Sequence, residues 1–555
     1  MAKKHDLHAW TETPVIITPP NTTPSCEYDD ETGRTMPAFS DLSFRSIGLE
    51  PNLVNALQKA FPDVKRPTVV QEKLIKEIIF GGRDILLKDD TGSGKYVAVS
   101  SLFFVLGMYS NWILSFIRSF AIVLGLLSKP RVVLEEKGQD GQKVLKRVIT
   151  SLFIVPHRDL AYQLLHWIER ILLQLKPELK LESITQVLVR GSEKTIEETV
   201  EEIKVTPPHI LICTPQAFLE AYKVDKEALQ LERLSTVVVD EVDYLVPTVA
   251  KDPKKSYWKA YEKEVRKVRK HPGPTREILD IVYARRKELW EEQQGYNDVP
   301  QLILSSATLR AHLKDYLFYE SGWLNGLNLV KIGGPAEKKM LRIEHSILVV
   351  SDTGVAEGAR IAEGKERVRE AEEEAEEALD EYYDESKWLS VKEALLPIII
   401  ILLEYTATAS PFNPISLEAV AAVFGSDVPT AALLVIPSSA PVKRAVYELR
   451  GMGVNAHCLD LQHAVGGHRA KPTLLVATVA TTRGLDLPSL THVFVLGLLE
   501  GTASTGRGVD SYLHISGRVG RFGRAGKVIS IVEGTEAPKV GQILSAIRVQ
   551  FKESI

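Results

Sequence analysis

Residues 235–245, STVVVDEVDYL, place two acids directly behind a short β-branched run. Such a run is typical of a strand buried on both faces of a parallel sheet. Asp240 and Glu241 follow it at once, at the sheet edge where α/β proteins bind metal ions and ligands. On its own the pair is better explained by surface acids that cap a strand. A second segment about 150 residues upstream changes that balance.

The upstream segment, KDDTGSGK (88–95), follows another apolar run and resembles a phosphate-binding loop. Its glycines let backbone amides close around phosphate groups, and its lysine reaches the β and γ oxygens. With this loop present, Asp240 is expected to hold a hydrated Mg²⁺ and Glu241 to orient or deprotonate the attacking water. The residues assigned to nucleotide binding here are Thr91, Gly92, Ser93, Gly94 and Lys95.

The loop departs from its usual pattern at Tyr96, where a Ser or Thr hydroxyl should bind Mg²⁺. Excising the 23 residues 96–118 would place Ser119 directly after Lys95 and lead into an apolar helix. The codons for Lys-Tyr-Val and Arg-Ser can hide a splice donor and acceptor, so we hypothesise a retained intron. A genuine insert and a membrane span are the rival interpretations. Ser119 is a metal ligand only if 96–118 is absent.

Apolar runs that alternate with helical patterns predict an α/β protein with two domains, each a parallel sheet with helices on both faces. The expected strands are 84–88, 151–155, 209–213, 235–240 and 301–306, then 432–436, 473–477, 492–496 and 527–532. We divide the chain into a disordered segment 1–38, a first domain 39–345, an acidic linker 346–393 and a second domain 394–555. The first domain holds a basic helical insertion, 250–290, which either contacts RNA phosphates or is a solvated helix.

Composition and charge argue against a nonspecific polyanion-binding protein, a disulfide-rich protein and a zinc protein. A net charge of −4 gives no sign of nonspecific polyanion binding, so any nucleic-acid contact needs a local groove. The three scattered cysteines predict neither a disulfide framework nor a zinc site, which favours a reducing intracellular compartment. No clear targeting signal is present, which leaves nucleus and mitochondria open. No membrane association is expected, and we expect a monomer.

These segments and several others, in this order, resemble the DEAD-box family of superfamily 2 helicases over nearly all of residues 39–535. DEVD (240–243) looks like its DEAD box, FPDVKRPTVVQ (61–71) its Q motif, and SSAT (305–308) its SAT motif. VPHRDLAYQ (155–163) is similar to PTRELA, and TPQA (214–217) to TPGR. The resemblance implies adenine contact by Phe61 and Gln71, coupling by Ser306 and Thr308, and RNA contact by Pro156, Arg158, Gly191, Thr214 and Pro215.

The second half of the chain carries the remaining motifs. VATVATTRGLD (476–486) is similar to ATDVAARGLD, and HISGRVGR (514–521) to HRxGRxxR. The resemblance implies RNA contact by Thr478 and Arg483, with Arg483 and Gly484 also coupling the domains. It implies nucleotide contact by Gly484 and Asp486, and arginine fingers at Arg518 and Arg521.

The resemblance implies two RecA-like domains and an ATP-dependent RNA helicase that uses ATP and Mg²⁺. It would clamp single-stranded RNA or a short duplex with little sequence preference, and remodel duplexes or ribonucleoproteins. Tyr96, Val479 and Ile515 depart from the family pattern. They favour the alternative of a hydrolysis-impaired RNA-binding scaffold in a ribonucleoprotein assembly.

Overall fold

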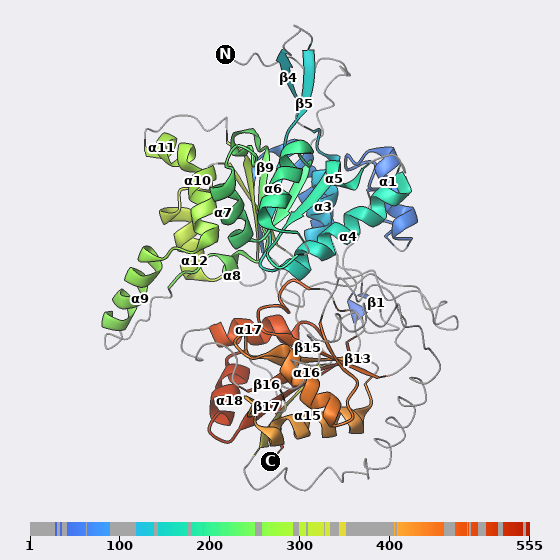
Figure 1. The fold of residues 1–555 in the computed structure, drawn as a ribbon, viewed down its shortest axis with the longest axis vertical. Coiled ribbons are helices and arrows are strands. Elements are labelled where there is room, and N and C mark those ends of the chain that lie inside the picture. The colour runs from blue at the N-terminus through green and yellow to red at the C-terminus, as the bar shows by residue number, and fades with distance from the viewer. Residues whose placement is uncertain are drawn as a thin grey trace, which may run out of the picture.

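Two seven-stranded sheets organise the computed structural model of the chain (Figure 1). The first has the strand order β11-β3-β10-β9-β6-β8-β7 and the second has the order β14-β15-β13-β16-β17-β12-β18. Every neighbouring pair in both sheets is parallel. The predicted α/β class with two parallel-sheet domains is therefore confirmed.

The structure describes part of the chain. The described residues are 28–29, 34–35, 42–62, 64–88, 118–131, 133–137, 143–175, 180–192, 194–249, 258–291, 299–306, 309–326, 328–333, 343–350, 405, 408–429, 431–459, 472–485, 487, 490–497, 507–519, 526–547 and 551–554.

The first domain contains the following elements in chain order: α1 (Pro51–Ala60), α2 (Val69–Lys76), η1 (Glu77–Gly81), β3 (Asp84–Lys88), α3 (Arg118–Ser128), β4 (Val133–Lys137), β5 (Lys143–Arg147), β6 (Ser151–Ile154), α4 (Arg158–Leu175), α5 (Leu181–Ile184), β7 (Thr185–Leu188), α6 (Ile196–Val205), β8 (Ile210–Cys213), α7 (Pro215–Val224), η3 (Leu231–Arg233), β9 (Thr236–Val239), α8 (Val242–Leu245), α9 (Trp258–Lys270), α10 (Pro274–Val282), α11 (Ala284–Glu291), β10 (Gln301–Ser306), α12 (Ala311–Asp315), η5 (Tyr316–Glu320) and β11 (Leu329–Gly333).

The second domain contains β12 (Ile343–Val350), α15 (Pro414–Asp427), β13 (Ala431–Ile436), α16 (Val442–Gly451), β14 (Ala456–Cys458), β15 (Thr473–Thr478), β16 (His492–Leu496), α17 (Arg507–Ser516), β17 (Gly526–Glu533), α18 (Ala537–Ala546) and β18 (Phe551–Ser554).

All nine predicted strands are present, each within a residue or two of its expected bounds. The strands that the sequence did not reveal include the outermost ones, such as β7 (TQVL) and β14 (AHC). An edge strand is flanked on one side only, so it does not need the continuous apolar run that identifies a central strand.

The domain boundary predicted at residue 345 is wrong. Strand β12 begins at Ile343 and pairs in parallel with β17 along its whole length, so it belongs to the second sheet. Residues 346–350, assigned to the acidic linker, are part of this strand because the sequence SILVV continues an apolar pattern. The rest of the linker lies outside the described residues.

The sequence predicts that the N-terminal segment 1–38 is disordered. Strands β1 (Tyr28–Asp29) and β2 (Arg34–Thr35) form a short antiparallel pair inside it, so the prediction is wrong at those four residues. The remainder of the segment lies outside the described residues.

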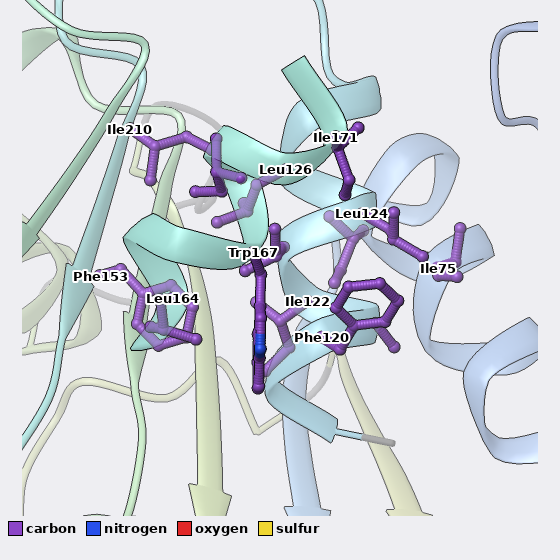
Figure 2. Packing of buried hydrophobic residues seen from close by; sticks show 14 of the residues in the cluster. Ile75, Phe120, Ile122, Leu124, Leu126, Phe153, Leu164, Trp167, Ile171 and Ile210 are labelled. Carbon is purple, nitrogen blue, oxygen red and sulfur yellow. The ribbon is translucent and has the colours of Figure 1, made fainter. Parts of the chain in front are cut away.

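Helix α3 lies in the core of the first domain. Phe120 and Ile122 lie beside Trp167 of α4, whereas Leu124 lies toward Ile75 of α2 (Figure 2). A Cβ at Gly125 would approach Ile78 of η1 to 3.0 Å, so the two helices are in close contact. Because so many of its side chains are buried, α3 has a single register on the sheet. That register fixes the position of the residues in its first turn.

Helices α9, α10 and α11 occupy the predicted insertion between β9 and β10. Two arginines hold it to the domain. Arg276 of α10 donates to the Pro247 carbonyl at 2.6 Å, and Arg286 of α11 donates to Asp84 at 2.6 Å in a fully buried pair. Burial raises the pKa of Asp84, although Arg286 and two backbone amides act in the opposite direction. The insertion is therefore part of the domain and not only a solvated helix.

Candidate active site between the two domains

The acids of the DEVD segment follow β9 and are buried. Asp240 accepts hydrogen bonds from the Ser119 hydroxyl at 2.6 Å and from the Glu241 amide at 3.0 Å. Glu241 is 2% exposed and lies in the left-handed region with φ of 54°. Within the described part of the chain, its Oε2 atom has no hydrogen-bond partner. A buried carboxylate oxygen without a partner and a strained backbone are both features of sites that bind a ligand.

Ser119 reaches Asp240 because it stands in the first turn of α3, the helix whose register is fixed by its buried face. In a phosphate-binding loop, the helix that follows the loop carries the hydroxyl at this position. The loop residues themselves, Thr91, Gly92, Ser93, Gly94 and Lys95, lie outside the described residues, as do Tyr96 and the following residues to 117.

Asp243, the last acid of the DEVD segment, joins the two domains. Its Oδ1 accepts a hydrogen bond from the Ser306 hydroxyl at 2.8 Å, and its Oδ2 lies 3.3 Å from Nε2 of His514 in α17. Nδ1 of the same histidine lies 3.9 Å from Glu241 Oε2. Glu241, Asp243 and His514 can each offer an atom within 4.8 Å of the others, so both domains contribute to one cluster. Thr308 lies outside the described residues.

Two arginines flank this cluster. Arg310 forms a two-pronged ion pair with Asp510 of the second domain, with its Nη2 atom donating to Oδ1 at 2.6 Å. Arg518 is buried behind α17, where its Nε donates to the His514 carbonyl at 3.0 Å and its Nη1 donates to the Leu485 carbonyl. Arg518 is thus held beside the cluster by backbone carbonyls of its own domain. Arg521 and Asp486 lie outside the described residues.

A second contact between the domains centres on Arg483. Its carbonyl accepts a hydrogen bond from His157 Nε2 at 2.5 Å, and its guanidinium lies 4.7 Å from the centre of the Tyr244 ring. Burial lowers the pKa of His157 to about 4, so the ring is neutral at physiological pH. Its Nδ1 then accepts from the Leu160 amide at 3.3 Å, in the first turn of α4. His157 therefore links that helix to the second domain.

The backbone after Arg483 also docks on the first domain. A Cβ at Gly484 would lie 2.7 Å from a Leu160 methyl group, so a larger residue would collide with α4. Leu485 is completely buried and belongs to the hydrophobic cluster of the first domain. Residues 483–485 therefore form an apolar contact between the domains.

The residues expected to contact RNA in the first domain lie at one edge of its sheet. Pro156 and Arg158 follow β6, Gly191 follows β7, and Thr214 and Pro215 follow β8. These three strands are neighbours and parallel, so the loops after them lie together. Arg158 donates to the Gly191 carbonyl at 3.1 Å, which joins two of the loops directly.

The Q-motif aromatic ring and two of the expected RNA-contact residues in the second domain are buried in packed surroundings. Phe61 is buried, packs edge-on against Phe120 at 5.2 Å between ring centres, and carries the Arg170 guanidinium over its ring. It has no open face for an adenine base. Arg483 and Thr478 are also buried, at 6% and 9% exposure. Their expected contact with RNA stays a prediction.

Gln71 caps α2 together with Thr68. Its Oε1 accepts from the Thr68 amide at 2.8 Å, while the Thr68 hydroxyl accepts from the Gln71 amide. This capping box is a sufficient local reason for glutamine at position 71. The expectation that Gln71 reads the edge of adenine has no support in these contacts. The close approach of Leu160 is a sufficient reason for glycine at position 484. No contact with a nucleotide is needed to explain it.

Five residues of this interface are not predicted by any motif in the sequence: His157, Tyr244, Arg310, Asp510 and His514. Each makes a contact across the domain interface, between positions that are at least 200 residues apart in the chain. The spacing of residues within one motif does not indicate which distant residue each of them contacts. The only available signals were the departures from the motifs themselves, such as His157 in place of the threonine of PTRELA.

Comparisons with known proteins agree with this architecture. The family described as DEAD/DEAH box helicase matches residues 68–316, and the helicase conserved C-terminal domain matches residues 464–523. The ATP-dependent RNA helicase DBP9 of Pyricularia oryzae is 28% identical over 245 residues, which cover 42% of this chain and 29% of that protein. This chain thus spans less than a third of the length of that relative.

Two longer matches cover most of the chain. The mitochondrial translation ATP-dependent RNA helicase mrh5 of Schizosaccharomyces pombe is 22% identical over 88% of this chain and 78% of its own length. The structure of S. cerevisiae Dbp5 bound to RNA and ADP BeF3 has a TM-score of 0.52 at 15% identity. That match covers 92% of this chain and 95% of that one, and it shows that the two domains have the RecA-like fold. Among the described residues, no helix has the length and apolar character to cross a bilayer.

Proposed function

Because this chain belongs to the DEAD-box family of superfamily 2 helicases, we propose that it is an RNA-dependent ATPase that clamps RNA and remodels duplexes or ribonucleoproteins. One observation carries the proposal. The acids after β9 meet Ser119 of α3 and His514 of the second domain in a single buried cluster. A nucleotide bound beside that cluster would contact both domains, so its hydrolysis would change how they fit together.

Hydrolysis would use the two acids differently. Glu241 would orient a water molecule and accept its proton as the oxygen attacks the γ-phosphorus, while the bond from phosphorus to the bridging oxygen breaks to give ADP and phosphate. Asp240 and the Ser119 hydroxyl provide the oxygen ligands that Mg²⁺ prefers. When bound, the ion would neutralise charge on the phosphates. Lys95, Arg518 and Arg521 would complete the charge stabilisation.

RNA would lie over the loops that follow β6, β7 and β8. Arg158 and the backbone at Gly191 and Thr214 would contact phosphates, which gives little sequence preference. Ser306 would transmit the state of the nucleotide through Asp243 and His514 to the second domain. The contact between Arg483 and the first domain would form as the clamp closes.

An RNA-binding scaffold with impaired hydrolysis is the second candidate. Val479 and Ile515, which replace polar residues of the family motifs, are both buried in the core of the second domain. They contribute packing at positions where the motifs carry polar side chains. The 23 residues between Lys95 and Ser119 also favour this candidate if they are present in the mature protein.

The test of the proposed function is ATP hydrolysis by the full chain, with and without single-stranded RNA. We expect RNA to stimulate the rate and single-stranded DNA to stimulate it much less. Equal rates with and without RNA, combined with intact RNA binding, would establish the scaffold instead.

Replacing Tyr244 with Leu should weaken the coupling between RNA binding and hydrolysis. The change removes the aromatic face beneath Arg483 but keeps an apolar side chain. A cation–π contact of this kind contributes about 1 kcal/mol, so the RNA concentration for half-maximal ATPase stimulation should rise about fivefold. Tyr244→Phe keeps the ring and should behave as the wild type. If the Phe and Leu variants respond alike, the ring is not part of the coupling.

We further propose that the protein works on a ribonucleoprotein in mitochondria. The support is that mrh5, named for mitochondrial translation, matches 88% of the chain. A fluorescent fusion that stays outside mitochondria in the native host would refute this location without bearing on the enzyme chemistry.

A further inference from the structure

Helix α9 carries an unusual concentration of positive charge. Its sequence, WKAYEKEVRKVRK, has six basic residues and two acidic ones, a net charge of +4 in a chain whose total is −4. Its cations include Lys263, Lys267 and Lys270, which are exposed and spaced at i, i+4 and i+7. That spacing puts them on one face of the helix. We call this face the lysine stripe.

The described residues do not neutralise the lysine stripe. Within the described part of the chain, none of its three lysines has an ion-pair partner; the ion pair of this helix joins Arg266 to Glu262. Basic residues near the carboxyl end of a helix are stabilised by its dipole, which would explain Lys270 but not Lys263, two turns from that end. Like charges on one face repel each other, so a polyanion that binds there would relieve the repulsion.

The opposite end of the helix exposes aromatic surface. Trp258 is 59% exposed, and its ring centre lies 5.5 Å from that of Tyr261. Its indole nitrogen donates to Glu262 at 2.9 Å, which holds the ring in place one turn away from the first lysine of the stripe. Exposed aromatic rings next to basic side chains are a common platform for the bases and phosphates of single-stranded nucleic acid.

Helix α9 is followed in the chain by α10, which is packed against the first domain. Figure 1 shows α9 projecting from the body of the first domain, while α10 packs against α7. Helix α7 starts at Pro215, directly after Thr214 of the loop that we place along RNA. Gly273, which follows α9, lies close to Pro247 behind the DEVD helix, and Arg276 donates to the Pro247 carbonyl. The base of α9 is thus connected to the loop after β8, which we place along RNA, and to Pro247, which follows α8 of the DEVD segment.

We propose that the lysine stripe of α9 binds the phosphates of RNA that extends beyond the cleft between the domains. The stripe spans about 10 Å along the helix, over which one nucleic-acid strand presents about three phosphates. The contact is electrostatic and has no sequence preference. It lengthens the RNA footprint of the first domain, and it rests on the proposed function.

The experiment compares RNA binding by the full chain and by a triple variant, Lys263→Gln, Lys267→Gln and Lys270→Gln. Glutamine keeps helix propensity close to that of lysine, so α9 should still form. The probes are a long single-stranded RNA and a short one that only reaches across the two domains, each with a non-hydrolysable ATP analogue. The matched control removes the same charge from three exposed lysines elsewhere, Lys59, Lys226 and Lys539.

For the long RNA, the triple variant should bind about tenfold more weakly, and the slope of log K against log salt should fall by about 2, as expected when three phosphate contacts are lost. Its affinity for the short RNA, and the control with either RNA, should match the wild type. An unchanged affinity and slope with the long RNA would overturn the proposal, as would an equal loss for both RNAs. If the wild type binds neither RNA, the proposed function itself has failed.

Discussion

Glu241→Gln should lower the rate of RNA-stimulated ATP hydrolysis by about 10²–10⁴-fold, the usual contribution of a positioned general base. The amide has the same shape as the carboxylate but cannot take a proton from water. Glu241 is suited to that role because it is buried at 2% exposure and its Oε2 atom has no hydrogen-bond partner among the described residues. The fold should tolerate the change, since among the described residues that oxygen makes no hydrogen bond and is approached only by His514, at 3.9 Å.

The measurement is steady-state ATP hydrolysis at saturating RNA and Mg²⁺, together with RNA binding in the presence of a non-hydrolysable ATP analogue. RNA binding should persist in the variant, because the domains can still close on an intact nucleotide. Glu418→Gln, an exposed glutamate on α15, is the matched control and should leave both quantities unchanged. Turnover by Glu241→Gln at the wild-type rate would rule out Glu241 as the base.

The sequence was sufficient to predict the central strands, because β9, β10, β13 and their neighbours are apolar runs buried on both faces. It was also sufficient to place Asp240 at the end of a strand, since that position follows from chain order alone. It was not sufficient for Phe61, because a motif gives the identity of a residue and not its burial. Nor did it locate the boundary before β12, where three polar residues in the first half of the strand obscure an apolar pattern.

The contacts between the domains form the other class of missed features. His157, Tyr244 and Arg483 come together only when both sheets are complete and docked. Nothing local selects histidine or tyrosine at these positions. The same limit applies to the position after Lys95. In the sequence, Tyr96 follows Lys95, whereas Ser119 would follow it if residues 96–118 were absent. The sequence cannot decide which of the two stands beside Asp240, because that depends on where the hydroxyl lies in three dimensions.

We propose Ser119 as the residue whose hydroxyl binds magnesium. It stands in the first turn of α3, and its hydroxyl lies 2.6 Å from Asp240 at the end of β9. If residues 96–118 are removed, residues 89–95 connect β3 to Ser119, and the joined sequence DDTGSGKS has the eight-residue length of a phosphate-binding loop with a serine after the lysine. The burial of α3 explains why the helix keeps its place even with 23 additional residues before it.

The chain joined from Lys95 to Ser119 should therefore hydrolyse ATP at least about 10-fold faster than the 555-residue chain, because the lysine and the hydroxyl then act on the same nucleotide. Even residues that only orient a metal ligand typically change metal affinity or activity about 10- to 100-fold. Ser119→Ala in the joined chain should abolish that gain, and Ser119→Thr should retain it, because threonine supplies the same hydroxyl. Sequencing the mature transcript across codons 95–119 provides an independent measurement. A joined chain that is no faster than the full one, together with a transcript that encodes 96–118, would mean that the segment is a genuine insert and would favour the scaffold over the enzyme.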